Sequence, residues 1–347
     1  MRNNYKRLFL MSLYFLIFTP LLILIINKAY IFFYGIPMVQ PSAGKSNGVV
    51  YANLSQAFRL ENGRLYINWE EVERLPPALN VSYPYGKNVV FYYPGVFVKF
   101  DQPKKETINR DGIRATKNYS VAKPANVYRI VLLGDSFVYG CGVEDNETLS
   151  FLLEHLLNQE SKGKLYEVLN FGAGGYNTAM EVERFEKVAL KYKPNMVILF
   201  YNANDIERGD ITAKLDRSLM RYLSSHIKDQ VVAWNLRLKV IPEYNRRYLN
   251  GSFDGLWMRV SGPLKRLDEL SKKWNFSVIV VAYPSPVEHI RKLRETAKSY
   301  GWEFIDLEGK IGYKFQDPWI IDTKDTHPSP YANKKVTELL AYGYILQ

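Results

Sequence analysis

Cysteine is almost missing from this sequence, since Cys141 is the only one among 347 residues. A framework of intramolecular disulfides is therefore excluded, and no group of Cys and His has the spacing of a zinc site. We expect neither a structural metal nor a cofactor. The single thiol lies in a glycine-rich turn, and we interpret it as a small turn residue rather than a nucleophile.

Internal repeats are lacking too, which excludes a solenoid. Hydrophobic residues make up 47% of the chain and aromatic residues 14%, which is enough to bury a real core. The formal net charge of +11 suits nucleic acid, an anionic membrane face or anionic glycans. Charge alone does not choose among these partners.

Residues 8–26 form an apolar run without charged side chains, about as long as a helix that crosses the hydrocarbon core of a bilayer. We predict a transmembrane helix here, because spanning helices tolerate a proline such as Pro20. The alternative is a cleaved signal peptide. However, the run exceeds the usual apolar region of a signal peptide, and no small-x-small cleavage site precedes Lys28.

Basic residues before this run outnumber those just after it, with Arg2, Lys6 and Arg7 against Lys28. The positive-inside rule then predicts a single-pass membrane protein with a cytoplasmic N-terminus and the rest of the chain outside. Residues 1–28 are the predicted cytoplasmic start and anchor. Nucleic-acid binding is not expected, because it conflicts with this topology.

Residues 29–126 are rich in Tyr, Val, Phe, Pro and Asn, and short apolar runs at 89–93 and 96–100 are separated by Pro94 and Gly95. This composition predicts a β-rich segment. Two interpretations stay open. The segment is either a stalk that lifts the next domain off the membrane, or an accessory module that packs on that domain and shapes its site.

Residues 127–347 alternate apolar strand-like runs with amphipathic helical stretches, which is typical of βαβ units. We predict an α/β domain with a parallel five-stranded sheet, whose strands lie at residues 128–133, 166–170, 196–201, 278–283 and 303–305. A basic insertion at about residues 206–262 interrupts the alternation, with nine Lys or Arg between Arg208 and Arg247. It suits a lid or binding element and equally a basic face on anionic lipid.

Two polar blocks carry residues suited to nucleophilic catalysis. Ser136 stands in Gly-Asp-Ser-Phe, residues 134–137, at the carboxyl end of the first predicted strand, where open α/β sheets place their ligands. We expect His327 on the loop before the last predicted helix, which Ser329 and Pro330 would start. A serine needs an imidazole to take its proton and a carboxylate to orient that imidazole, and Asp325 can supply the carboxylate.

The other three histidines lie in helical or insertion stretches without such a local partner, namely His155, His226 and His289. Two more blocks follow the second and third strands, a glycine-rich run at residues 170–176 and an asparagine-containing run at 202–205. Backbone N–H groups and asparagine amides are the donors that stabilise an oxyanion during acyl transfer.

These four blocks, in this order and each at a strand end, resemble those of the SGNH/GDSL hydrolase superfamily over roughly residues 127–340. The resemblance implies that Ser136 is the nucleophile and His327 its base. It also implies an oxyanion hole made of the Ser136 N–H, the Gly175 N–H and the Asn204 amide. Ester chemistry through an acyl-enzyme, without a metal, follows from the same resemblance.

The resemblance further implies a flavodoxin-like three-layer αβα sandwich, and residues 109–114 are similar to the Asn-x-x-Gly-x-Arg lead-in of membrane-anchored members. The last block departs from the family pattern, because Lys324 stands where the family has its aspartate. We assign the triad acid to Asp325, with Asp322 as the alternative. Gly172 and Gly174 remain alternatives to Gly175.

The sequence thus predicts an extracytoplasmic serine ester hydrolase, an acyl or acetyl esterase. Its expected substrates are ester-bearing surface glycans, cell-wall polymers or lipids. One alternative is an O-acetyltransferase of surface polysaccharide, which would use the same residues but pass the acyl group to a sugar hydroxyl. Another is an inactive glycan- or lipid-binding protein that uses the basic insertion, although the complete set of site residues argues against it.

Overall fold

The computed structural model describes residues 57–61, 64–68, 70–71, 84–93, 100–161, 163–206 and 253–347, and the single positions 219, 222, 223, 226, 227 and 236. All of them belong to one compact unit, Val49–Gln347. The predicted transmembrane run at residues 8–26 lies outside the described residues. Within the described ranges, no helix combines the length and apolar character that crossing a bilayer requires.

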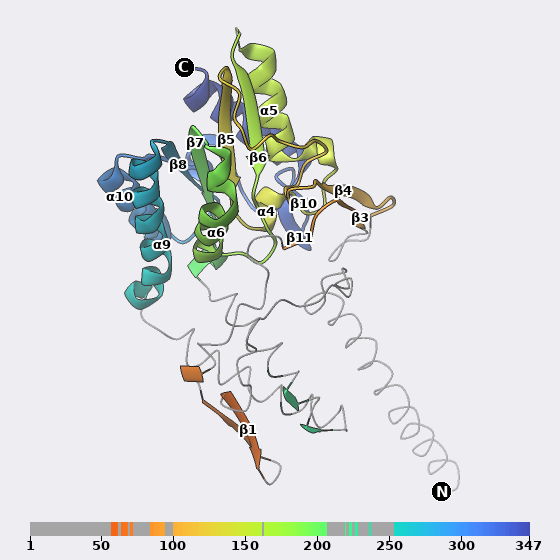
Figure 1. The fold of residues 1–347 in the computed structure, drawn as a ribbon, viewed down its shortest axis with the longest axis vertical. Helices are drawn as coiled ribbons and strands as arrows, with labels where there is room; N and C mark the ends of the chain where they lie inside the picture. The colour runs from red at the N-terminus through yellow and green to blue at the C-terminus, as the bar shows by residue number, and fades with distance from the viewer. Residues whose placement is uncertain are drawn as a thin grey trace, which may run out of the picture. The chain divides into compact units, whose positions relative to one another are not determined.

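A parallel sheet of five strands forms the centre of the unit (Figure 1), in the order β6-β5-β7-β8-β9. Its strands are β5 (Val127–Leu133), β6 (Leu165–Asn170), β7 (Met196–Tyr201), β8 (Ser277–Ala282) and β9 (Glu303–Asp306). The predicted parallel sheet is confirmed, and each predicted strand end is within one residue of the observed end. All residues of β7 are buried, because helices cover both faces of the sheet.

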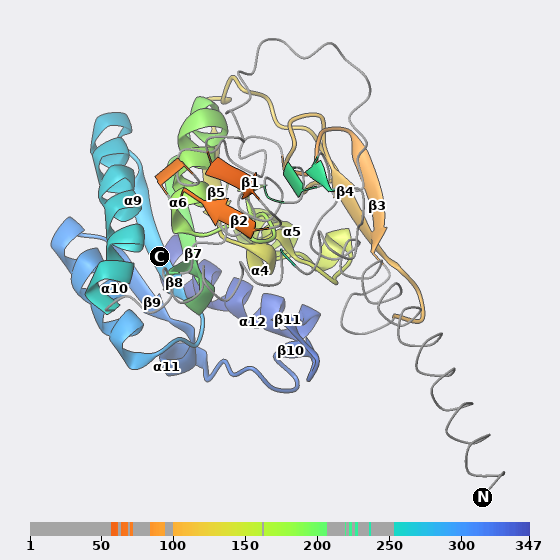
Figure 2. The same ribbon diagram turned by 90° about the horizontal axis from the view of Figure 1, so that it is seen from below.

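Two hydrophobic clusters, one on each face, make the unit three layers thick. One cluster joins the sheet to α6 (Thr178–Arg184), α9 (Phe253–Trp274) and α10 (Val287–Tyr300). The other joins it to α5 (Leu149–Glu160), α11 (Leu307–Ile311) and α12 (Pro330–Leu340). Successive residues of β5 alternate between the two clusters, as the period of a strand requires. Figure 2 shows α6, α9 and α10 together on one side of the sheet.

Two antiparallel hairpins precede the sheet in the chain, β1 (Phe58–Glu61) with β2 (Arg64–Ile67) and β3 (Val89–Tyr93) with β4 (Lys104–Ile108). The apolar run predicted at 89–93 forms β3, whereas most of the run at 96–100 lies outside the described residues. On β4, Thr107 donates from its N–H and its hydroxyl to the carboxylate of Asp145, at 2.9 and 2.6 Å. The second hairpin is therefore bonded directly to the α/β domain.

The basic insertion ends earlier than the predicted limit at residue 262, because α9 already begins at Phe253. Trp257, which the sequence placed in the basic tract, is buried and belongs to the same cluster as Val260 and Leu264. These residues face the core at helical spacing, so residues 253–262 are a covering helix of the sheet and not part of the insertion.

Candidate active site

Ser136 is the first residue of a short helix, α4 (Ser136–Tyr139), that follows β5 directly. The turn between strand and helix is tight, since a Cβ on Gly134 would lie 2.3 Å from Cγ2 of Val138. The Asp135 side chain caps the helix by accepting the Phe137 N–H at 2.9 Å. This turn holds the serine at the carboxyl end of β5, an inner strand of the sheet.

His327 lies on β11 (Asp325–Pro328), which pairs antiparallel with β10 (Ile320–Asp322). The sequence predicted a loop here, and the hairpin corrects that expectation. The predicted helix start is confirmed, because Ser329 caps α12 and Pro330 is its first residue. The hairpin and the helix cap fix the histidine from both sides along the chain.

The two polar blocks meet in a continuous line of hydrogen-bonding atoms. His327 Nε2 lies 2.9 Å from Ser136 Oγ, and His327 Nδ1 lies 2.6 Å from Asp325 Oδ1. Asp325 is only 1% exposed, and its Oδ1 also accepts the backbone N–H of His327 at 3.2 Å. Asp322 instead accepts the N–H of Lys324 at 2.9 Å, within the hairpin turn. This arrangement can remove the proton of a serine hydroxyl.

The remaining histidines have other surroundings. His289 Nδ1 lies 2.8 Å from the hydroxyl of Tyr201 in the core, and burial lowers the pKa of His289. The His226 ring is bonded to the backbone oxygen of Tyr222. His155 stacks on Phe151.

The predicted oxyanion asparagine is held beside the serine by Asp135. Oδ2 of Asp135 accepts from Nδ2 of Asn204 at 3.1 Å and from Nδ2 of Asn202 at 3.3 Å. The pKa of Asp135 is raised, because burial raises it more than the hydrogen bonds from Phe137 and the two asparagines lower it. An asparagine amide has two N–H donors, so Asn204 keeps one for an incoming oxygen. The N–H of Ser136 also has no acceptor among the described residues.

The glycine-rich run after β6 offers a single backbone N–H. Gly172 donates to the Asn170 side chain at 3.0 Å, and Gly174 donates to the Tyr85 hydroxyl at 2.6 Å. The N–H groups of Ala173 and Tyr176 are bonded to backbone oxygens. Within this run, only Gly175, whose φ is 75°, has an N–H without an acceptor among the described residues. Of the three candidate glycines, Gly175 is thus the one whose donor is available.

Two buried carboxyls lie next to this site, and the sequence reasoning did not select either of them as a functional residue. Glu181, on α6, is fully buried, and neither of its oxygens has a hydrogen-bond partner among the described residues. Burial and the charge of Asp205 raise the pKa of Glu181 well above its usual value, and burial and the charge of Asp135 do the same for Asp205. Asp205 adjoins Asn204 in a block that the sequence did mark, but no local pattern marks Glu181.

The lead-in motif at residues 109–114 supports the turn that follows α4. The buried guanidinium of Arg114 donates to the backbone oxygens of Gly140 and Val143 at 3.1 and 2.9 Å. It also pairs with Asp145 at 3.3 Å and with Glu106 at 3.4 Å. Arg114 therefore connects the β3–β4 hairpin to the loop after the serine helix.

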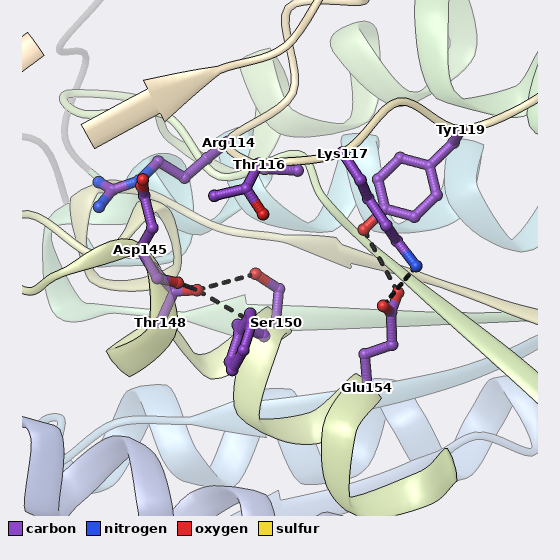
Figure 3. A pocket seen from close by; sticks show the side chains of 10 residues that line it. Arg114, Thr116, Lys117, Tyr119, Asp145, Thr148, Ser150 and Glu154 are labelled. Carbon is purple, nitrogen blue, oxygen red and sulfur yellow. Dashed lines mark hydrogen bonds and ion pairs between the residues drawn. The ribbon is translucent and has the colours of Figure 1, made fainter. Parts of the chain in front are cut away.

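A cavity of about 70 Å³ lies between this lead-in and the start of α5. Figure 3 shows Arg114 beside Asp145 and both Lys117 and Tyr119 directed at Glu154. The charged side chains that line this cavity are paired with one another, and none of the predicted site residues lines it.

In the described ranges, no three His, Cys, Asp or Glu side chains are grouped so that they could bind a metal ion.

Comparisons with known proteins bear on this arrangement. Residues 132–266 match the model of the GDSL-like Lipase/Acylhydrolase family. No curated protein matches the chain.

Solved structures resemble the chain at low sequence identity. A lipolytic protein of the G-D-S-L family from Desulfitobacterium hafniense is 15% identical over 61% of this chain and 97% of its own, with a TM-score of 0.41. The acetyl xylan esterase AlAXEase is 15% identical over 62% and 100%, with a TM-score of 0.42. A two-domain esterase active on acetylated mannans is 15% identical over 62% and 48%, with a TM-score of 0.40.

Proposed function

We propose that this chain is a hydrolase of ester bonds that acts as an extracytoplasmic serine esterase through Ser136, His327 and Asp325. The match of residues 132–266 to the GDSL-like Lipase/Acylhydrolase family supports ester hydrolysis. The observation that carries this proposal is the line of short contacts from Ser136 Oγ through the imidazole to the buried Asp325 carboxylate. A serine hydroxyl is a weak nucleophile without such a base, and the carboxylate selects the imidazole tautomer that can accept the proton.

In the proposed reaction, Ser136 Oγ attacks the ester carbonyl while His327 Nε2 takes its proton. The negative charge that develops on the carbonyl oxygen accepts hydrogen bonds from the Ser136 N–H, the Gly175 N–H and the Asn204 amide. The imidazolium then gives its proton to the departing alcohol oxygen, which leaves an ester between the acyl group and Ser136. Water, deprotonated by His327, attacks this ester and releases the acid.

The proposed location and substrates rest on the N-terminal part of the sequence. The apolar run at residues 8–26 and the basic residues before it support an anchor with the domain on the outer side of the membrane. We propose that the substrates are esters of surface glycans, cell-wall polymers or lipids, with small acyl groups such as acetyl.

The test uses the full chain in a mild detergent with p-nitrophenyl acetate. The expected result is turnover that disappears in Ser136→Ala, together with an acetyl adduct on the Ser136 peptide by mass spectrometry after an acid quench. Ser299→Ala is the matched control, because this exposed hydroxyl lies on α10 and contacts only the backbone oxygen of Thr296.

Two outcomes would change the proposal. A folded protein without turnover or adduct, with acetyl and with longer esters, would refute the esterase and favour a binding protein. An adduct that is released much faster by a sugar hydroxyl than by water would identify an acyltransferase that uses the same serine.

A further inference from the structure

Tyr85 reaches the glycine loop from the segment that precedes the α/β domain. Its hydroxyl oxygen accepts the N–H of Gly174 at 2.6 Å. Its ring lies on Tyr139, with ring centroids 4.4 Å apart, and also packs against the cluster of Ala173, Tyr176 and Met180. A residue outside the predicted catalytic domain thus contacts the loop that carries Gly175.

Tyr85 and the serine approach Gly174 from neighbouring directions. A Cβ placed on Gly174 would lie 2.8 Å from the Tyr85 hydroxyl oxygen and 3.8 Å from Ser136 Cβ. Any larger residue at Gly174 would therefore press on the phenol. The glycine allows the phenol to approach the backbone within the same small space as the nucleophile.

The bond to Tyr85 determines which donors the loop offers. The Ala173 N–H donates to Gly134 at 3.0 Å, and the Arg184 guanidinium holds the Phe171 and Gly172 oxygens at 2.8 and 3.1 Å. These contacts hold the start of the loop but not Gly174. Without the phenol, the N–H groups of both Gly174 and Gly175 would lack an acceptor, and an unsatisfied N–H favours rearrangement of the loop. With the phenol in place, only the Gly175 N–H of this pair lacks an acceptor.

Tyr85 itself is fixed to the domain by its neighbours. The Asn88 N–H donates to the Asn109 backbone oxygen at 3.0 Å. Tyr139, whose ring packs on the Tyr85 ring, donates from its hydroxyl to Glu106 at 2.8 Å. Burial raises the pKa of Tyr85 well above its usual value. The phenol thus stays neutral, and its oxygen remains a hydrogen-bond acceptor at physiological pH.

We propose that Tyr85 is a positioning residue of the oxyanion hole. Its hydroxyl accepts the Gly174 N–H and so holds the loop with the Gly175 N–H available to the substrate. This inference rests on the proposed esterase function and deepens it, because it makes the segment before the α/β domain part of the catalytic apparatus. Tyr85 acts through the loop and does not touch the reacting atoms.

The experiment compares Tyr85→Phe with the wild-type full chain. The substitution removes the hydroxyl and keeps the ring that packs on Tyr139. Tyr119→Phe is the matched control, since its buried hydroxyl also bonds the backbone, but at Val168 O within β6 and not in the glycine loop. The concentration of active sites is measured by labelling to completion with an aryl phosphonate. The maximal rate is divided by this concentration, so misfolded protein does not lower kcat.

The first expected result is a kcat about tenfold lower in Tyr85→Phe, with KM within about twofold, because transition-state donors affect kcat. Tyr119→Phe should leave both constants within about twofold. The second is amide exchange at Gly174 that is about tenfold faster in Tyr85→Phe alone, measured by mass spectrometry with residue-level fragmentation.

An unchanged kcat in Tyr85→Phe, or a loss that equals the loss of countable sites, would overturn the proposal. If the wild-type chain has no turnover that depends on Ser136, the esterase function fails instead. The exchange measurement then still decides the role of Tyr85, because unchanged protection of Gly174 would refute the positioning contact without any assay of activity.

Discussion

Substitution of Asp325 by Asn tests the assignment of the triad acid most directly. The side chain keeps its shape and loses its charge at a position that is 1% exposed. In the wild type, Asp325 Oδ1 lies 2.6 Å from His327 Nδ1, so the ring donates there and keeps Nε2 free to accept the Ser136 proton. An Asn amide that presents its own N–H to Nδ1 would favour the opposite tautomer.

The loss should be large. In a serine protease, the equivalent change lowers kcat about 10⁴-fold. Asp325 is the one acid among the described residues that hydrogen-bonds the imidazole, so we expect a loss of about 10³- to 10⁴-fold in kcat/KM. At about 1.36 kcal/mol per factor of ten, this is about 4 to 5.5 kcal/mol of transition-state stabilisation.

Asp322→Asn is the matched control from the same hairpin. Its Oδ1 accepts the Lys324 N–H and lies near the Thr323 hydroxyl, and the oxygen of an Asn amide can keep both contacts. We expect kcat/KM for p-nitrophenyl acetate within about threefold of the wild type. A larger loss in Asp322→Asn than in Asp325→Asn would refute the reasoning, because the acid would then be the other aspartate.

Three other substitutions test the surroundings of the site. Burial and the charge of Asp205 raise the folded-state pKa of Glu181. Its contribution to the free energy of unfolding is therefore present below the unfolded pKa of about 4.3 and is lost as pH rises through the folded pKa. In urea unfolding, Glu181→Gln should make the fall of the unfolding free energy with pH less steep, and an identical pH dependence would contradict the burial argument. Arg114→Met should lower the unfolding free energy by about 3–5 kcal/mol, because it leaves the Glu106 charge buried without its partner; a loss below about 1 kcal/mol would contradict this. Gly172→Ala should lower the melting temperature, since its Cβ would lie 2.4 Å from the Tyr139 backbone nitrogen, and an unchanged melting curve would show that the backbone yields easily.

The sheet could be predicted from the sequence because strands buried on both faces form continuous apolar runs. β7 is the clearest case, with six buried residues in Met-Val-Ile-Leu-Phe-Tyr. Ser136, Gly175 and Asn204 could be predicted because each follows a strand of the parallel sheet, and parallel strands bring their carboxyl ends to one edge. His327 and Asp325 lie on β11 instead, and their motif, not a strand end, marked them. The structure brings His327 within hydrogen-bonding distance of both Ser136 and Asp325.

Other features depend on contacts between distant parts of the chain, which no local pattern records. The contact of Tyr85 with Gly174 spans 89 residues, and nothing around Tyr85 distinguishes it from other tyrosines of its segment. The start of α9 was missed because Trp257 follows a run of basic residues, and only its burial shows that it faces the core. The β10–β11 hairpin is equally hidden, since most positions of its two short strands are polar.

The distance along the chain between Ser136 and His327, 191 residues, has a consequence for biosynthesis. A ribosome completes the nucleophile, both oxyanion loops and all five strands of the parallel sheet before it adds the base. Until β11 has been made and has paired with β10, the serine has no imidazole to accept its proton, and a chain that stops short of that hairpin carries a nucleophile that cannot be activated. Ester hydrolysis should therefore begin late, and its appearance during cell-free synthesis would report that the last part of the domain has folded onto the first.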